Sequence, residues 1–224
     1  MSSPSDKVLH LRQLLAERFK EASLPSQETY ATGLPALDDI GLPRGALTEV
    51  VASNSSNPGG TLLFYALLHA VLRQGERVIL VDGKNSFVPN GVSPSDLPHL
   101  LWVRCHQAWE AIKATDLAVR DGNIPLVVVF LALNPPGELR KIPAPSWHRL
   151  QLLAEKSDAT VLVFTPQAQV GCARLRLSVD GSFPLKKLHV ARAGLVSSLN
   201  LHVARRRIGQ ERSTDEAIRR AACA

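Results

Sequence analysis

The sequence predicts an α/β protein with a mostly parallel sheet flanked by helices, antiparallel C-terminal strands and an N-terminal helix. Three observations support this fold class. Short apolar segments alternate with helical segments between residues 46 and 165, as in sheets whose strands are joined by helical crossovers. The apolar segments lack polar alternation, which indicates burial on both faces. After residue 172, apolar and polar residues alternate, which is typical of strands with one face in water.

The first 28 residues are predicted to form an N-terminal helix and a linker. Apolar residues recur at helical spacing over residues 6–22, and Ser5 or Asp6 is suited to cap that helix. The segment 23–27 then ends the pattern. We therefore divide the chain into an N-terminal segment (1–28), a core (29–204) and a basic C-terminal tail (205–224).

Five apolar segments of the core are predicted to form buried strands. They have the usual strand length of about four to eight residues and span residues 46–52, 77–82, 100–104, 125–132 and 160–165. Apolar residues at helical spacing predict helices over residues 61–74, 107–120 and 145–157. Gly75 suits the end of the first of these helices, because glycine readily adopts the left-handed conformation found there.

The C-terminal part of the chain is predicted to extend the sheet with antiparallel strands. Alternating segments occur at residues 173–179, 187–192 and 199–205. A short helix is predicted within the tail at residues 214–221.

The composition is that of a globular protein, with 45% apolar and 21% charged residues among 224. No apolar run approaches the roughly 18 residues that a membrane span needs. The first residues lack the basic and apolar segments of a secretory signal, so a cytoplasmic location is expected. The three cysteines are too few and too scattered for a disulfide framework or a zinc site, so no metal is expected.

The excess positive charge lies in the last quarter of the chain. Residues 1–171 carry 15 basic and 16 acidic side chains, whereas residues 172–224 carry 11 basic and 4 acidic ones. This asymmetry favours an anionic partner, of which nucleic acid is the usual example. The alternatives are solubilising charge on an exposed strand and tail, or a segment that orders on a protein partner. The candidate contacts are Arg205, Arg206, Arg207, Arg212, Arg219 and Arg220, with weaker support for Arg140 and Lys141.

A loop between the first core strand and its helix has most of the spacing of a phosphate-binding loop. Such a loop reads G-x-x-x-x-G-K-[ST], and here the same positions read Asn54-Ser-Ser-Asn-Pro-Gly-Gly-Thr61. Gly59 and Thr61 match the motif, but Asn54 replaces the first glycine and Gly60 replaces the lysine that would contact the β- and γ-phosphates. Backbone N–H groups at the helix start could still hold an anion weakly. We expect at most a vestigial nucleotide site.

The acid that would help to hold Mg²⁺ is also missing from the expected strand. Phosphate-loop enzymes carry an Asp at the end of a buried strand, but the segment 125–132 offers Phe130 and Leu131 there. Asp82 is the one acid well placed at a strand end. It is a candidate cofactor contact, with a loop-capping role as the favoured alternative.

Together these features resemble the RecA-like ATPase core. The resemblance rests on Ala31-Thr-Gly-Leu-Pro-Ala-Leu-Asp38, on Gly41-Leu-Pro-Arg-Gly-Ala-Leu-Thr-Glu-Val50 and on the order of elements over about residues 30–170. Three catalytic positions of that family are changed. The loop lysine is Gly60, the strand-end acid is lost near Phe130, and Lys84 stands near the position of a catalytic glutamate. The resemblance therefore implies a RecA-like fold with degenerate ATPase motifs and no catalytic residues.

Within this superfamily the chain looks most like the ImuA group. That resemblance implies a non-catalytic bacterial accessory protein of the SOS response to DNA damage, active in mutagenesis and translesion DNA synthesis. The implied partners are an ImuB-like Y-family polymerase homologue, RecA and an error-prone C-family polymerase complex, with DNA contacted through the basic tail. No cofactor is expected, although weak ATP binding stays open.

Two alternative functions stay open. One is a SulA-like cell-division inhibitor that binds FtsZ. The other is a RecA-like DNA-dependent ATPase with an atypical loop, which would use Thr61 and a lysine from elsewhere such as Lys84.

Overall fold

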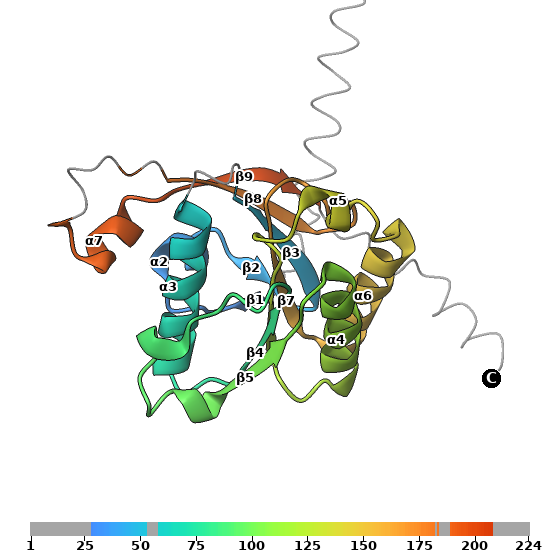
Figure 1. Ribbon diagram of the computed structural model, residues 1–224, viewed down its shortest axis with the longest axis horizontal. Helices are drawn as coiled ribbons and strands as arrows, with labels where there is room; N and C mark the ends of the chain where they lie inside the picture. Colours follow the sequence, from blue (N-terminus) through green and yellow to red (C-terminus); the bar gives the residue numbers. More distant parts are fainter. Residues whose placement is uncertain (1–27, 53–57, 182, 184–188, 208–224) are drawn as a thin grey trace, which may run out of the picture.

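The centre of the structure is one seven-stranded sheet (Figure 1). The computed structural model describes residues 28–52, 58–181, 183 and 189–207. In chain order the strands of the sheet are β3 (Ala46–Val51), β4 (Val78–Asp82), β5 (Leu100–Arg104), β6 (Leu126–Phe130), β7 (Thr160–Thr165), β8 (Leu175–Asp180) and β9 (Asn200–Arg206). The five strands predicted between residues 46 and 165 are thus confirmed.

The sheet is parallel except at one edge. Its spatial order is β5-β4-β6-β7-β3-β8-β9, and only β9 runs antiparallel to its neighbour. This confirms the predicted α/β fold class, and the arrangement is consistent with a RecA-like fold. One detail differs from the expectation: β8 pairs parallel with β3, so the antiparallel part begins only at β9.

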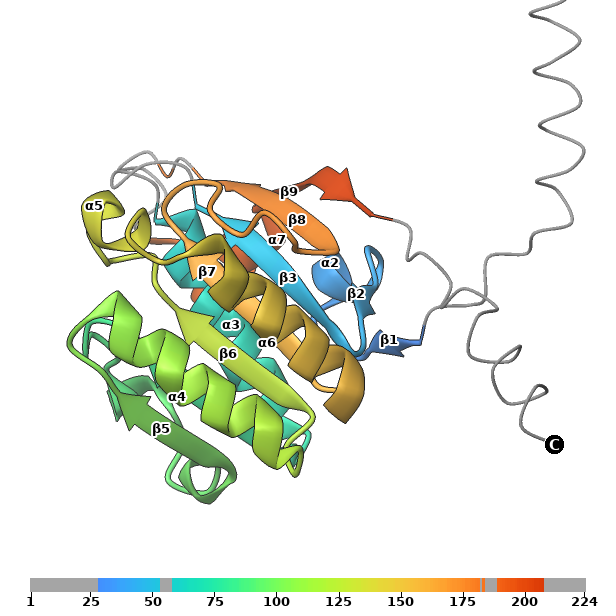
Figure 2. The same cartoon turned by 90° about the vertical axis from the view of Figure 1, so that its right-hand side faces the viewer.

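Helices cover both faces of the sheet (Figures 1 and 2). One face carries α2 (Pro35–Asp38), α3 (Gly59–Arg73) and α7 (Arg192–Ser197), and the other carries α4 (Ala108–Asp121), α5 (Pro136–Leu139) and α6 (Ala144–Ser157). The three helices predicted in the core correspond to α3, α4 and α6. A small antiparallel pair, β1 (Thr29–Tyr30) and β2 (Leu42–Pro43), precedes the sheet, and two 3₁₀ turns (Pro89–Gly91 and Leu97–His99) lie between β4 and β5.

Each face of the sheet has its own apolar core. On the α3 side the Phe64 ring lies 4.3 Å from the Phe130 ring and 5.6 Å from the Phe164 ring, measured between centroids. On the other side, α4 and α6 bury Ile112 and Trp147 against the strands. Every residue of β3, β4, β6 and β7 is buried. Burial on both faces explains why these strands read as nearly uninterrupted apolar runs.

The predicted strand at residues 187–192 is wrong for the residues that the structure describes. Residues 189–191 are not in a strand, and α7 begins at Arg192. The same sequence, His-Val-Ala-Arg, occurs at 189–192 and at 202–205, where it belongs to β9. The second copy pairs with β8, where His202 lies opposite Ser178. Since strand formation depends strongly on the neighbouring strand, so short an alternation does not define a strand by itself.

Some predictions fall outside the described residues. They are the helices at 6–22 and 214–221, the loop residue Asn54, and the tail residues Arg212, Arg219 and Arg220. Among the residues that are described, no helix combines the length and the apolar character that a membrane crossing requires.

Candidate functional site

The described residues of the degenerate phosphate loop lie where helix α3 begins, after strand β3. The loop follows β3, which is central in the sheet, and leads into α3, whose N-terminal residues Gly59 and Gly60 are both buried. Thr61 is half-buried in the first turn of the helix. Of the four predicted loop residues, the structure therefore places these three together at the start of α3.

Gly60 is packed too tightly to be replaced by any residue with a side chain. A β-carbon at Gly60 would overlap the β-carbon of Ala52, the residue that follows β3. The helix start is pressed directly against the end of the strand. The lysine of a working phosphate loop would therefore need the helix to move away from the strand.

The chain after β8 closes against the same helix start. A β-carbon at Gly181 would lie 2.8 Å from the Gly59 Cα and 3.2 Å from the Gly59 nitrogen. Both distances are shorter than ordinary van der Waals contact, so only glycine fits there without a shift. Backbone from the end of β8 therefore occupies space beside the first residue of α3.

Asp82 at the end of β4 is fully buried and organises the loop that follows it. Its Oδ2 accepts hydrogen bonds from the backbone N–H groups of Ser86 (2.7 Å) and Phe87 (2.8 Å), and its Oδ1 accepts one from the Ser86 hydroxyl (3.1 Å). A carboxylate that accepts hydrogen bonds in this way fixes a turn. This geometry matches the loop-capping alternative for Asp82.

Phe130 occupies the strand end where an ATPase of this type would carry its acid. It lies opposite Asp82 in the register of β4 and β6. Its buried ring packs against Phe64 from α3. The position has become part of the apolar core.

Lys84 pairs with a residue of α5, whereas α3 is the helix that follows the degenerate phosphate loop. Its Nζ lies 3.7 Å from the Glu138 Oε1, and Glu138 Oε2 accepts hydrogen bonds from Asn134 Nδ2 (3.0 Å) and from the backbone N–H of Ala108 (3.3 Å). Ala108 is the first residue of α4, so this carboxylate caps the positive end of that helix. The hydrogen bond from Asn134, then the one from Ala108 and the positive charge of Lys84, lower the pKa of Glu138.

The three consecutive arginines of the predicted basic tail do not form one surface. The predicted start of the tail is Arg205, but Arg205 and Arg206 are the last two residues of β9. Arg205 Nη2 donates to the carbonyls of Val170 and Ala173, both at 3.2 Å, and Arg206 Nη2 donates to the carbonyl of Ile40. Because successive side chains of a strand point to opposite faces, only alternate arginines share a side. Arg207 is exposed.

Arg140 and Lys141 are both exposed, directly after α5. The segment directly before them is the short helix α5. Leu139 and Ile142 on either side are buried and hold the segment in place. The two basic side chains are therefore available for contacts at the end of the sheet where β6 terminates.

Sequence analysis missed Glu49, a fully buried acid in the middle of β3. Its carboxylate accepts hydrogen bonds from Arg176 Nε (2.6 Å), the Thr165 hydroxyl (3.0 Å) and the backbone N–H groups of Gln169 (2.6 Å) and Val170 (2.9 Å). The only signal in the sequence was a charged residue inside an otherwise apolar strand. Such a residue requires partners, but the sequence does not identify them.

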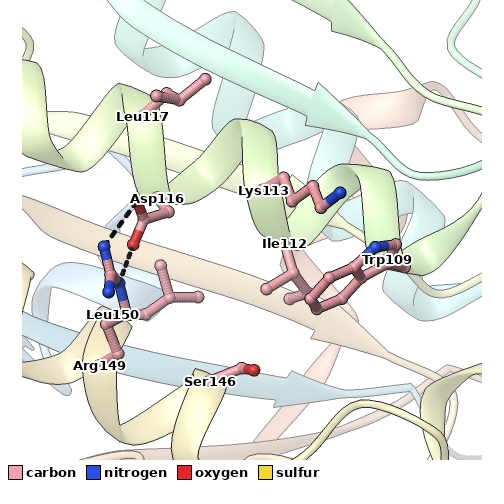
Figure 3. A pocket seen from close by; sticks show the side chains of 8 residues that line it. All are labelled: Trp109, Ile112, Lys113, Asp116, Leu117, Ser146, Arg149 and Leu150. Atoms are coloured by element: carbon pink, nitrogen blue, oxygen red, sulfur yellow. Dashed lines mark hydrogen bonds and ion pairs between the residues drawn. The ribbon is translucent and has the colours of Figure 1, made fainter.

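A largely apolar groove lies between α4 and α6. It has a volume of about 430 Å³, and Ile112 and Leu150 lie within it between the two helices (Figure 3). The Trp109 ring, 48% exposed, lies toward one end, with the Lys113 ammonium 4.9 Å from its centroid.

An ion pair between the two helices lies toward the other end of this groove. Asp116 accepts a hydrogen bond from Arg149 Nε at 2.5 Å (Figure 3). It also accepts one from Arg120 on its own helix. The hydrogen bond from Arg149 is the main cause of a lowered pKa for Asp116. The groove thus combines a half-exposed aromatic ring with fixed charges, which is a combination found at protein interfaces.

No protein-family model matches the chain, and no curated protein matches it. Among the described residues, no group of three or more His, Cys, Asp or Glu side chains is arranged to hold a metal ion.

Proposed function

We propose that this chain is a cytoplasmic, non-catalytic RecA-like accessory protein that acts through protein partners in damage-induced mutagenesis and translesion DNA synthesis. The partners proposed from its resemblance to the ImuA group are an ImuB-like Y-family polymerase homologue, RecA and an error-prone C-family polymerase complex. DNA bound through the basic C-terminal tail is the proposed additional partner.

The main support for the non-catalytic part of the proposal is the tight packing at Gly60. The contact between Gly60 and Ala52 leaves no room for a side chain at the position of the phosphate-binding lysine. Phe130 in the apolar core and Lys84 paired with Glu138 support the same interpretation. Backbone amides without a lysine or a metal-holding acid supply little of the charge stabilisation that phosphoryl transfer requires.

Calorimetry with ATP and Mg²⁺, run beside a sensitive hydrolysis assay, tests this part. We expect neither binding nor turnover. Turnover that the Thr61→Ala variant abolishes would overturn the proposal and favour the ATPase alternative. Binding without turnover would contradict the expectation that no cofactor is bound, but it would leave the non-catalytic role intact.

The partner part of the proposal is supported by the groove between α4 and α6. Half-exposed tryptophans are among the commonest anchors of protein interfaces. Pull-down of the ImuB-like homologue and of RecA should weaken when Trp109 is changed to Ala. Leu152→Ala is the matched control, because Leu152 is an exposed apolar residue of α6 outside the groove lining. Equal binding by both variants would exclude the groove as the binding surface.

The SulA-like alternative makes a different prediction. An FtsZ-binding inhibitor would lower the GTPase activity of FtsZ at stoichiometric concentration, whereas the proposed accessory protein would leave it unchanged. The predicted helix at 6–22 is a second candidate for the segment that docks on RecA or the ImuB-like protein. Undiminished binding of both partners by a chain without residues 1–28 would exclude it.

A further inference from the structure

Besides the apolar groove between α4 and α6, a polar pocket lies on the α3 side of the sheet, far from the start of α3. It has a volume of about 640 Å³ and is formed by the C-terminal half of α3 and by the loop that contains residues 90–96. His69 and Arg73 line it from α3, and they are four residues apart, so both lie on one face of the helix. Arg73 is about 18 Å along the helix axis from Thr61, at 1.5 Å per residue.

A second arginine contacts His69 from α7, beside the pocket. Arg192 Nη1 lies 3.4 Å from His69 Nε2. A guanidinium has only donors, so this contact requires that Nε2 carry no proton and act as the acceptor. The hydrogen bond therefore selects the neutral imidazole.

The opposite wall of the pocket supplies hydroxyl groups. The Ser93 and Ser95 hydroxyl oxygens are 2.8 Å apart, and the Ser95 hydroxyl donates to Asp96 Oδ1 at 3.0 Å. Both serines and Asp96 line the pocket.

The local charge is positive. Arg73 and Arg192 face His69, and Asp96 is the acid that offsets them. Burial, then the positive charge of Arg192 and of Arg73, lower the pKa of His69, and Asp96 opposes this shift only in part. The Arg73 guanidinium, the His69 imidazole and two serine hydroxyls thus line one open volume, and the Arg192 guanidinium adjoins it through its contact with His69. Guanidinium groups are frequent binders of phosphate in proteins.

We propose that this pocket binds a phosphate group. Arg73 and Arg192 supply the positive charge, and His69 takes up a proton on binding because the anion outweighs the two arginines. The phosphate belongs either to a free nucleotide or to the backbone of a nucleic acid strand. This inference goes beyond the proposed function, since it involves neither the degenerate loop nor the basic tail.

Binding of inorganic phosphate to the full-length chain, followed by NMR of the His69 ring across pH 5–8, is the direct test. We expect phosphate to raise the pKa of His69, because the bound anion stabilises the imidazolium. Arg73→Ala and Arg192→Ala should each weaken phosphate binding at least tenfold. Arg77→Ala is the matched control: Arg77 is exposed just after α3, outside the pocket lining, and its loss changes the net charge equally.

Two results would overturn the proposal. One is a His69 titration that phosphate does not alter. The other is a loss of binding in Arg77→Ala as large as in the two pocket variants, which would mean that general positive charge attracts the anion. Unfolding curves of all three variants show whether loss of the fold is the cause. Arg73→Gln provides a second variant, which removes the charge but keeps a polar side chain with the same first three carbons.

The source of the phosphate is assigned by competition once inorganic phosphate binds. ATP and a short single-stranded oligonucleotide are each added to the phosphate-bound protein. Displacement by the oligonucleotide, with an affinity that falls steeply with salt, identifies a nucleic acid backbone as the ligand. Displacement by ATP alone identifies a free nucleotide.

Discussion

Glu49 in β3 and Arg176 in β8 lie opposite one another on neighbouring parallel strands, with Arg176 Nε 2.6 Å from Glu49 Oε2. The Glu49 side chain is fully buried and that of Arg176 is 18% exposed. The pair joins β8 to the centre of the sheet, and the other Glu49 oxygen fixes the segment after β7 through Gln169 and Val170. A single buried carboxylate therefore organises three parts of the chain.

Changing Glu49 to Ala should lower the free energy of unfolding by about 3–5 kcal/mol, the usual result of leaving one partner of a buried ion pair alone. Arg176 and two backbone N–H groups would lose their acceptor. Urea unfolding of the purified variant measures the loss. A decrease below about 1 kcal/mol, the size expected of a surface ion pair, would contradict this role.

Double replacement of Glu49 by Gln and Arg176 by Met should recover part of the stability lost in Glu49→Ala, because neither charge is then left unpaired.

Changing Gly60 to Ala should lower the free energy of unfolding by about 1–3 kcal/mol, the usual cost of overpacking. The reason is the overlap with Ala52. Gly137→Ala in α5 is the matched control, since a β-carbon there meets no atom within 4 Å. The double variant Ala52→Gly with Gly60→Ala should regain most of the lost stability in thermal or urea unfolding. If the double variant is no more stable than Gly60→Ala alone, the contact with Ala52 is not the cause.

Asp116 should make the stability of the protein fall in acid. The Arg149 and Arg120 contacts hold its pKa below the ordinary value of 3.8. A carboxyl group whose pKa is lower when folded stabilises the fold above its unfolded pKa, and the contribution is lost as pH falls through the folded pKa. The free energy of unfolding measured between pH 2 and 5 should therefore fall less steeply for Asp116→Asn than for the parent chain. Superimposable pH profiles would refute the assignment.

Arg205 and Arg207 should behave differently although they are two residues apart. Arg205 donates to two backbone carbonyls, so Arg205→Ala should lower the free energy of unfolding by about 1–2 kcal/mol. Arg207 is exposed, so Arg207→Ala should leave stability unchanged. If the tail binds DNA, Arg207→Ala should also reduce the salt dependence of binding. Unaltered DNA binding and salt slope in Arg207→Ala would exclude that side chain as a phosphate contact.

The buried strands of the core, the helices α3, α4 and α6 and the α/β class followed from the sequence because burial leaves a local pattern. The uninterrupted apolar segments that became β4, β6 and β7 are covered on both faces, and the helical spacing of apolar residues marks the buried sides of α3, α4 and α6. The degenerate loop could be recognised from its spacing, since the glycines and Thr61 are adjacent in the chain. Asp82 could be placed at a strand end because it directly follows the apolar run of β4 in the chain.

The partners of these residues could not be predicted, because they come from distant parts of the chain. Glu49 meets a residue of β8, and Lys84 meets Glu138 in α5. The contact of Gly60 with Ala52 crosses the loop and depends on how closely α3 approaches the sheet. His69 of α3 contacts Arg192 of α7, a helix that sequence analysis did not anticipate.

The sequence by itself determined which segments are strands and helices in most of the core, since each segment's pattern of apolar residues reports its burial. Only the tertiary structure decided how the repeated sequence His-Val-Ala-Arg is used. At 202–205 it pairs with β8 and forms part of a strand, whereas at 189–192 it leads into α7. The residues and their intrinsic preferences are identical at the two sites. The difference lies in whether a neighbouring strand supplies backbone hydrogen bonds, and that depends on contacts between residues far apart in the chain.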